Sequence, residues 1–212
     1  MTEYNPKLVQ SAEFAEATRI PQPGSPASIA LGRFFSRACF GRMWIIQELC
    51  VAREINATMV QCRNLPYKWS DVGAAAVWAS NNGYGITASE LNAGHPMHLY
   101  HVKQNYQSHG DLDAELTRKK GIMFLLNTSN AFQAPIRVDK VFALIGLAND
   151  LRSSSGKLLL RPKCERPVEM VMNGLGRVII HQHENLTPLQ YVRSYCREHP
   201  SLPTWVRDWT SA

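Results

Sequence analysis

Histidines are the first side chains in this sequence whose type and spacing could carry chemistry. His95, His98 and His101 recur at intervals of three residues, and His109 follows shortly after. A zinc ion requires three or four nitrogen, sulfur or oxygen ligands that converge at about 2.0–2.3 Å. On a helix, positions i, i+3 and i+6 spread over roughly 120°, so three imidazoles would converge poorly. Surface histidines are therefore the favoured interpretation, and a metal site is the alternative.

A second histidine pair, His181 and His183, adjoins Glu184. On an extended segment, the two imidazoles would share one face. These residues follow a helical pattern, however, and the C-terminus of a helix stabilises partial positive charge on histidine. A structural role explains the pair, so the sequence predicts neither a metal nor another cofactor.

Five cysteines could each offer a nucleophile: Cys39, Cys50, Cys62, Cys164 and Cys196. A catalytic thiolate requires a base within hydrogen-bond reach, and no local signature surrounds any of the five. Their odd number and the lack of a Cys-x-x-Cys pair favour reduced, buried thiols, which fits a cytoplasmic location, or a nuclear one. The sequence also lacks a Gly-x-Ser-x-Gly elbow and a phosphate-binding glycine loop after a strand. We therefore predict no catalytic residues.

The distribution of charged and apolar residues argues against nucleic acids and membranes as partners. The net charge is +6, but the basic residues are scattered, and only residues 118–120 and 161–163 group closely. Nucleic-acid binding depends on clustered Lys and Arg, so it is a secondary alternative. The longest apolar stretches, near residues 123–126 and 141–145, fall far short of the ~20 residues that cross a bilayer. No signal peptide is visible, and we expect no membrane association.

Helices must position most of these side chains. Apolar spacing predicts helices within residues 31–40, 42–52, 70–80, 112–126 and 139–147, and most clearly after Pro167. Residues 55–62 are rich in β-formers and predict a strand, closed by a turn that includes Asn64, Pro66 and Tyr67, and Ser70 is the expected N-cap of the next helix. Residues 86–109 carry no clear pattern.

These patterns together define the expected fold class and domain organisation. They predict a predominantly helical α+β fold whose helices pack around a small strand or hairpin. A length of 212 residues favours one domain. Residues 1–30 should form a poorly structured N-terminal segment, because a weak helical pattern is followed by a proline- and glycine-rich loop. Residues 31–212 should form the single domain.

Three motifs stand out within these elements. Residues 42–48 read Arg-Met-Trp-Ile-Ile-Gln-Glu, and a helix would place Gln47 and Glu48 close to Trp44. Residues 139–147 read Asp-Lys-Val-Phe-Ala-Leu-Ile-Gly-Leu, with an acidic residue where a helix N-terminus favours negative charge. Residues 202–209 read Leu-Pro-Thr-Trp-Val-Arg-Asp-Trp, whose two tryptophans could anchor an extended tail.

The three motifs, in this order, resemble segments of the fungal heterokaryon-incompatibility (HET) family. The first is similar to its Arg-x-Trp-x-x-Gln-Glu segment, the second to its Arg-Asp-Lys-x-x-Ala-Leu-x-Gly-Leu helix, and the third to its Leu-Pro-Ser-Trp-x-x-Asp-Trp segment. Cys62, Pro66 and Trp69 resemble the strand, turn and helix that follow the first motif. One departure is that Val138 precedes Asp139, while the arginine stands one position earlier. The resemblance covers residues 31–209.

Two other family segments do not occur in this sequence: a Ser-Tyr-x-Trp-Gly strand and a Trp-Ile-Asp-x-x-Cys-Ile-Asn-Gln segment. The first is where a TIR-like fold would build its opening strands. We therefore expect a truncated HET protein that corresponds to the second part of the family's region. No activity of the TIR-like portion can be carried over to it.

The resemblance implies a role in non-self recognition and programmed cell death through protein interaction, with a protein partner or the missing N-terminal half. The residues expected to act as structural anchors, without forming a catalytic site, are Arg42, Trp44, Gln47, Glu48, Asp139, Trp205, Asp208 and Trp209. One alternative is an enzyme that cleaves NAD or a nucleotide, with a partly desolvated Glu48 as base or as stabiliser of cationic character on a ribosyl centre. The other alternative is a basic module that binds nucleic acid.

Overall fold

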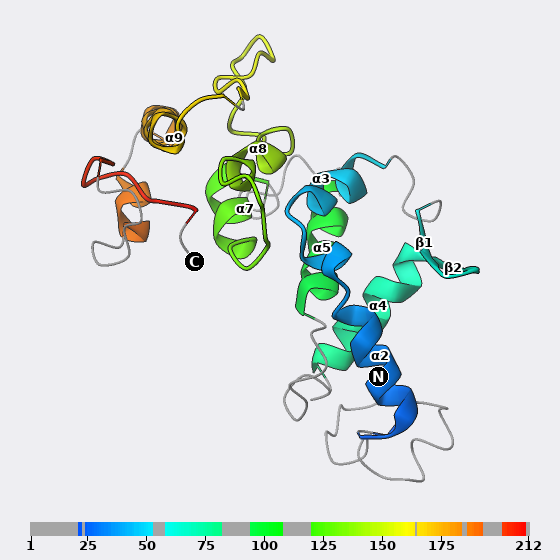
Figure 1. The fold of residues 1–212 in the computed structure, drawn as a ribbon. Helices are drawn as coiled ribbons and strands as arrows, with labels where there is room; N and C mark the ends of the chain where they lie inside the picture. The colour runs from blue at the N-terminus through cyan, green and yellow to red at the C-terminus, as the bar shows by residue number, and fades with distance from the viewer. Residues whose placement is uncertain are drawn as a thin grey trace. The chain divides into compact units, whose positions relative to one another are not determined.

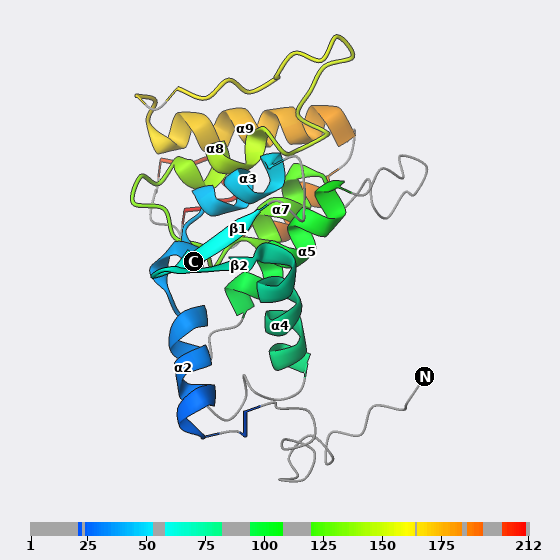
Figure 2. The same cartoon turned by 90° about the vertical axis from the view of Figure 1, so that its right-hand side faces the viewer.

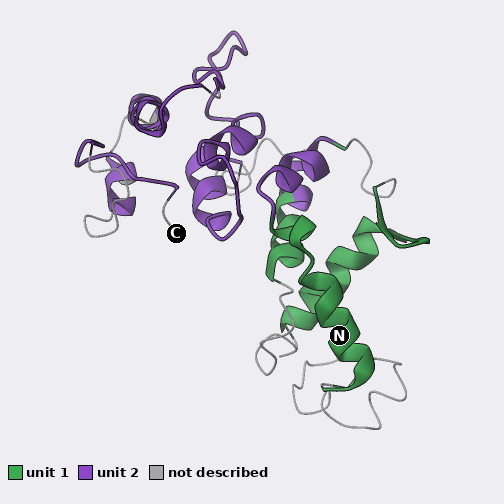
Figure 3. Cartoon of the chain, viewed as in Figure 1, with its two compact units in different colours: residues 1–41, 52–102 green, residues 42–51, 103–212 purple. Residues whose placement is uncertain are grey.

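The computed structural model describes residues 21–22, 24–52, 58–81, 94–107, 120–163, 165–183, 186–192 and 201–210. Within these ranges the chain forms seven α-helices, two short 3-10 helices and one antiparallel hairpin (Figure 1). The predicted class, a predominantly helical α+β fold with a small hairpin, is confirmed. The chain divides into two compact units, coloured separately in Figure 3. Unit 1 comprises residues 1–41 and 52–102, and unit 2 comprises residues 42–51 and 103–212.

The described part of unit 1 includes helix α2 (Pro26–Phe35) and the 3-10 helix η1 (Ala38–Gly41). The Ser25 hydroxyl accepts a hydrogen bond from the Ser28 N–H at 3.2 Å, and a proline occupies the first helical position. Both features favour a helix start at this point. Helix α2 therefore begins inside the segment that the sequence predicted to be poorly structured. The division into a segment 1–30 and one domain 31–212 stays a prediction.

The hairpin consists of β1 (Met59–Cys62) and β2 (Leu65–Lys68), joined by a two-residue turn. The sequence predicted a strand over residues 55–62, of which 55–57 lie outside the described residues. It missed β2 and predicted a turn at that position. Every residue of β2 is exposed, so this strand lacks the apolar alternation by which a half-buried strand is recognised.

Helix α4 (Trp69–Asn81) follows β2 without a linker. The Trp69 N–H donates to the carbonyl of Thr58 at 2.8 Å, which ties the start of the helix to the base of the hairpin. The prediction of Ser70 as N-cap is wrong, because this tight connection starts the helix one residue earlier. The Ser70 hydroxyl instead donates to the Asp71 carboxylate at 3.3 Å.

Helix α5 (Gly94–Gln107) occupies a stretch for which the sequence allowed no assignment. Its residues up to Val102 belong to unit 1. There it approaches α4 closely, since a Cβ atom on Gly73 would lie 2.1 Å from the ring of Tyr100. The missing side chain of Gly73 therefore permits this approach. The apolar core of unit 1 includes Phe35, Phe40, Trp69, Val72, Ala76, Ala79, Leu99 and Val102.

In unit 2, helix α8 (Asp139–Ile145) packs against both α3 (Trp44–Val51) and α7 (Ile122–Thr128). Six of the seven residues of α8 are buried, which makes it the central helix of this group. Both α3 and α8 were predicted from their apolar spacing, and their positions confirm those predictions. Of the helix predicted over residues 112–126, residues 112–119 lie outside the described part of the chain. Helix α7 coincides with the C-terminal end of that prediction.

Helix α9 (Val168–His183) is seen along its length in Figure 2. Val171, Met172, Leu175 and Ile179 form its buried face, as the predicted amphipathic pattern requires. The 3-10 helix η2 (Thr187–Tyr191) contacts α9 and precedes the described tail, residues 201–210. Among the described helices, none has both the length and the apolar character needed to cross a bilayer.

Candidate functional site

All eight side chains predicted as anchors lie in unit 2. Five belong to the group formed by α3 and α8, namely Arg42, Trp44, Gln47, Glu48 and Asp139, and three belong to the tail, namely Trp205, Asp208 and Trp209. Residues 42–51 join this unit although the segments on both sides of them in the sequence belong to unit 1. The motifs that are distant in sequence are therefore brought into one compact unit.

The first and second motifs are joined by a hydrogen bond between Trp44 and Asp139. The indole Nε1–H of the half-buried Trp44 donates to Oδ2 of Asp139 at 2.8 Å, across 95 positions of sequence. Asp139 is buried, with 8% of its surface exposed, and is the first residue of α8. Its carboxylate thus lies at the positive end of the α8 dipole and accepts an indole proton. The predicted position of Asp139 at the helix start is confirmed.

The other side chains of the first motif make separate contacts. Arg42 is exposed, while its backbone forms a bridge with Gln133, and the next amide, of Met43, donates to the Gln133 carbonyl at 2.8 Å. Gln47 faces Gly146 at the end of α8, where a Cβ atom would lie 3.0 Å from the Gln47 side-chain nitrogen. The side chain of Glu48 is exposed. This motif therefore attaches α3 to α8 and to the loop before it.

The tail has its own polar and aromatic contacts. Oδ1 of the buried Asp208 accepts hydrogen bonds from the Thr210 N–H at 2.9 Å and from the Thr210 hydroxyl at 2.6 Å. The ring of Trp209 is buried and lies 6.0 Å from the ring of Tyr191. The guanidinium of Arg207 lies 4.8 Å from the centre of the Trp209 ring and donates to the Tyr191 carbonyl at 2.6 Å. These contacts fasten the tail to η2.

Trp205 packs on α9 at a glycine. A Cβ atom on Gly176 would lie 3.2 Å from the Trp205 ring and 3.5 Å from Val206. The Trp205 side chain is half-buried, whereas the neighbouring Val206 is buried. Gly176 therefore has a packing role that explains a glycine within a helix.

Lys103 is a buried charged residue that sequence reasoning missed. None of its surface is exposed, and its Nζ donates to the carbonyl of Leu49 at 2.8 Å, near the C-terminus of α3. Burial lowers the pKa of Lys103. Burial also raises the pKa of the adjacent Cys50 thiol to about 12, although the Lys103 charge opposes this shift. Cys50 is therefore a neutral thiol at physiological pH and unsuited to attack as a thiolate. Because α5 lies in a stretch without a clear pattern, the sequence contained no signal for Lys103.

The three histidines of α5 form a row on one helix. His101 is exposed, but His95 and His98 are half-buried, so the prediction of surface histidines is wrong for His95 and His98. Burial, together with the smaller effect of the charges of His101 and His95, lowers the pKa of His98 to about 4. Among the described residues, no group of three or more His, Cys, Asp or Glu side chains is arranged to hold a metal ion. His109 and Glu184 lie outside the described residues, and so does the side chain of His183.

Trp44, Asp139, Asp208 and Trp209 make contacts within unit 2, whereas the side chains of Arg42 and Glu48 are exposed, so the anchor role of the whole set stays a prediction. The described carboxylates of this set are either engaged within the protein, as in Asp139 and Asp208, or exposed, as in Glu48. In comparisons with known proteins, no family model, no curated protein and no solved structure matches the chain.

Proposed function

We propose that this chain is a HET-family module that acts in non-self recognition and programmed cell death by binding another protein, and does not itself catalyse a reaction. Its partner would be another protein or the family's N-terminal half. The module would work in the cytoplasm or the nucleus, where its cysteines remain reduced. Cys39, Cys50 and Cys62 are free thiols, in agreement with such a compartment.

The hydrogen bond between Trp44 and Asp139 is the observation that carries this proposal. This hydrogen bond joins Trp44 of the first motif to Asp139 of the second, and it helps to hold α3 against α8. A residue whose polar atoms are used for internal attachment is expected to support a fold, leaving recognition to other surfaces. The contacts of Asp208 and Trp209 support the same view for the third motif.

The enzyme alternative depends on Glu48 being partly desolvated. Its side chain is exposed, so it lacks the burial that would favour a catalytic role. Incubation of the purified chain with NAD should release no nicotinamide above a buffer control. Nicotinamide release that is abolished by Glu48→Gln would overturn the proposal in favour of an enzyme.

Expression in a filamentous fungus tests the proposed function directly. We expect the chain to cause cell death, scored with a vital dye in hyphae, and Glu48→Gln to retain this effect. Asp139→Ala should abolish cell death, because the substitution releases α3 from α8. Asp71→Ala, which changes an exposed acidic residue in the first turn of α4, should retain it. Hyphal viability equal to that of an empty-vector strain, at a protein level verified by immunoblot, would contradict the proposal.

A further inference from the structure

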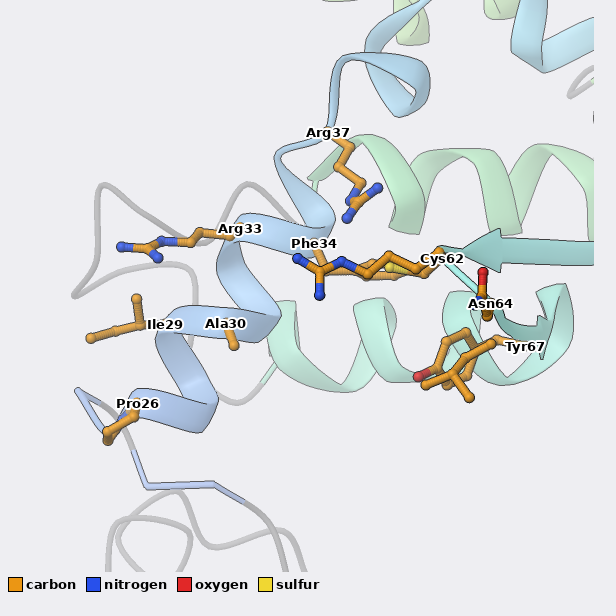
Figure 4. Close-up of a pocket in the computed structure, with 11 residues that line it drawn as sticks. Pro26, Ile29, Ala30, Arg33, Phe34, Arg37, Cys62, Asn64 and Tyr67 are labelled. Atoms are coloured by element: carbon orange, nitrogen blue, oxygen red, sulfur yellow. The ribbon is translucent and has the colours of Figure 1, made fainter.

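Unit 1 contains an open groove of about 570 Å³ between α2 and the hairpin (Figure 4), whereas the three motifs belong to unit 2. We call it the arginine groove. Figure 4 shows Phe34 and Arg37 from the α2 side, and Cys62, Asn64 and Tyr67 from the hairpin side, around this space. Its described lining consists of Pro26, Ile29, Ala30, Arg33, Phe34, Arg37, Cys62, Arg63, Asn64, Leu65 and Tyr67.

The charge of this lining is of one sign. Arg33, Arg37 and Arg63 are all exposed, and none of the described lining residues is acidic. In the described part of unit 1, the only carboxylate is that of Asp71, which bonds to Ser70 on α4. Guanidinium groups attract carboxylates, and one guanidinium can donate two parallel hydrogen bonds to one carboxylate.

The apolar part of the lining is suited to hold a side chain. Leu65 and Tyr67 are 61% and 44% exposed, which is high for large apolar residues on a small hairpin. The register pairs Cys62 with Leu65 and Val60 with Tyr67, so both exposed side chains lie on the same face of the hairpin. Ile29 and Ala30 of α2 also line the groove, and Figure 4 shows the Ile29 side chain on the side of α2 that faces away from the hairpin.

The Phe34 ring packs within unit 1, whereas the Tyr67 ring is 44% exposed. Phe34 makes edge or tilted contacts with Phe35, Phe40 and Tyr67, at centroid distances of 5.6, 5.5 and 6.3 Å. The Arg37 guanidinium lies 5.8 Å from the centre of the same ring. The Phe34 ring is therefore already surrounded, whereas binding of single-stranded nucleic acid depends on open aromatic faces.

Arg63 has a backbone conformation that residues other than glycine rarely adopt. Its φ is +55°, and it is the first residue of the two-residue hairpin turn, where glycine or asparagine is usual. The left-handed region is unfavourable for arginine, because the Cβ atom comes close to the following carbonyl oxygen. Such strain at a position that lines the groove suggests a use for the guanidinium group.

We infer that the arginine groove binds an acidic peptide segment of a partner protein, with carboxylates on the arginines and one apolar side chain on the surface formed by Leu65 and Tyr67. This inference rests on the proposed function, since it specifies the chemistry of the protein partner. Charge complementarity selects the acidic residues, and the exposed aliphatic lining selects the apolar anchor.

Selection from a random ten-residue peptide library displayed on phage tests this inference on the full chain. We expect enriched peptides to combine two or more Asp or Glu residues with one Leu, Ile, Phe or Trp. A fluorescein-labelled copy of the most enriched peptide is then titrated by fluorescence polarisation, and its affinity should fall as salt concentration rises. Enrichment of nothing, or of peptides without acidic residues, would overturn the inference.

Substitutions in the groove provide the specific readout. Arg33→Gln, Arg37→Gln and Arg63→Gly should each weaken peptide binding by about two- to fivefold, as expected for exposed charge pairs. Arg63→Gly is the most informative, because glycine suits the φ of +55° and should preserve or stabilise the hairpin. Arg161→Gln removes the same charge from an exposed site in unit 2 and should leave the affinity unchanged.

Two results would overturn the assignment. One is an affinity that depends on Arg161 and not on the groove arginines. The other is arginine-dependent binding of a twelve-nucleotide oligouridylate with no binding of acidic peptides, which would make the groove a nucleic-acid site.

The fungal assay separates the two proposals. If peptide binding depends on the groove but expression kills no hyphae, the proposed function alone fails. If hyphae die equally with the triple variant that combines Arg33→Gln, Arg37→Gln and Arg63→Gly and with the unaltered chain, the inference about the groove alone fails.

Discussion

The hydrogen bond between Trp44 and Asp139 allows a quantitative test of how unit 2 is held together. Asp139→Ala removes the acceptor of a part-buried indole proton, and a hydrogen bond to a charged group contributes about 1.5–3 kcal/mol. It also removes a negative charge from the first turn of α8, which contributes roughly 0.3–1 kcal/mol. We therefore expect a loss of about 2–4 kcal/mol in the opening free energy of α3 and α8.

A double-mutant cycle isolates the contact itself. Trp44→Phe removes the indole donor while retaining an aromatic ring, and the double variant should lose about 1.5–3 kcal/mol less than the sum of the two single variants. Asp71→Ala is the matched control, because Asp71 is also an acidic residue in the first turn of a helix but is exposed. It should cost only about 0.3–1 kcal/mol in the opening free energy of α4, measured on peptides that cover that helix, and leave the opening free energy of α3 and α8 unchanged.

Because the chain has two compact units, the measurement must report on unit 2 alone. Native-state hydrogen exchange of peptides that cover α3 and α8, followed by mass spectrometry, gives that local free energy. The reasoning is refuted if the Trp44 and Asp139 effects add within about 0.5 kcal/mol. It is equally refuted if Asp139→Ala costs no more than Asp71→Ala.

Three further predictions concern other described side chains. Gly73→Ala should destabilise unit 1 by about 1–3 kcal/mol in urea denaturation, since its Cβ would overlap the Tyr100 ring, and a Tyr100→Ala background should remove most of that loss. Cys50, whose pKa burial raises to about 12, should resist iodoacetamide at pH 8 in the native protein while the exposed Cys39 reacts, as read by peptide mass spectrometry; equal rates would contradict this. Since burial lowers the pKa of His98 to about 4, from an ordinary value near 6.5, the unfolded chain alone takes up this proton between those values. The contribution of His98 to the free energy of unfolding should thus be complete above pH 6.5 and fall by on the order of 2–3 kcal/mol towards pH 4. The urea midpoint should decrease accordingly, and the decrease should be smaller in His98→Gln. An unchanged midpoint would refute the burial of this ring.

Local pattern predicted most of the helical elements. The segments that became α3 and α9 carry apolar residues at helical spacing and have a buried face where the spacing placed it, whereas α8 is a short apolar run that is buried on all sides. Such prediction succeeds because one side of a helix in contact with a core must be apolar over several turns. The class of the fold follows from these elements.

Elements without such a pattern were missed for a physical reason. Strand β2 is exposed throughout, so its side chains carry no record of a buried face. In α5, a buried lysine replaces an apolar residue, and Lys103 is accommodated by the carbonyl of Leu49. The sequence cannot show that acceptor, because it lies 54 positions away.

The sequence by itself determined which residues are distinctive, namely the three motifs with their tryptophans and acidic side chains, and that they lie mainly on helices. Only the tertiary structure decided what these side chains do. It pairs Trp44 with Asp139, leaves Glu48 exposed, and attaches Trp209 to Tyr191. It also gathers three arginines from a helix and a hairpin turn around one groove. Contacts between distant positions depend on how helices pack, and spacing along the chain does not encode that packing.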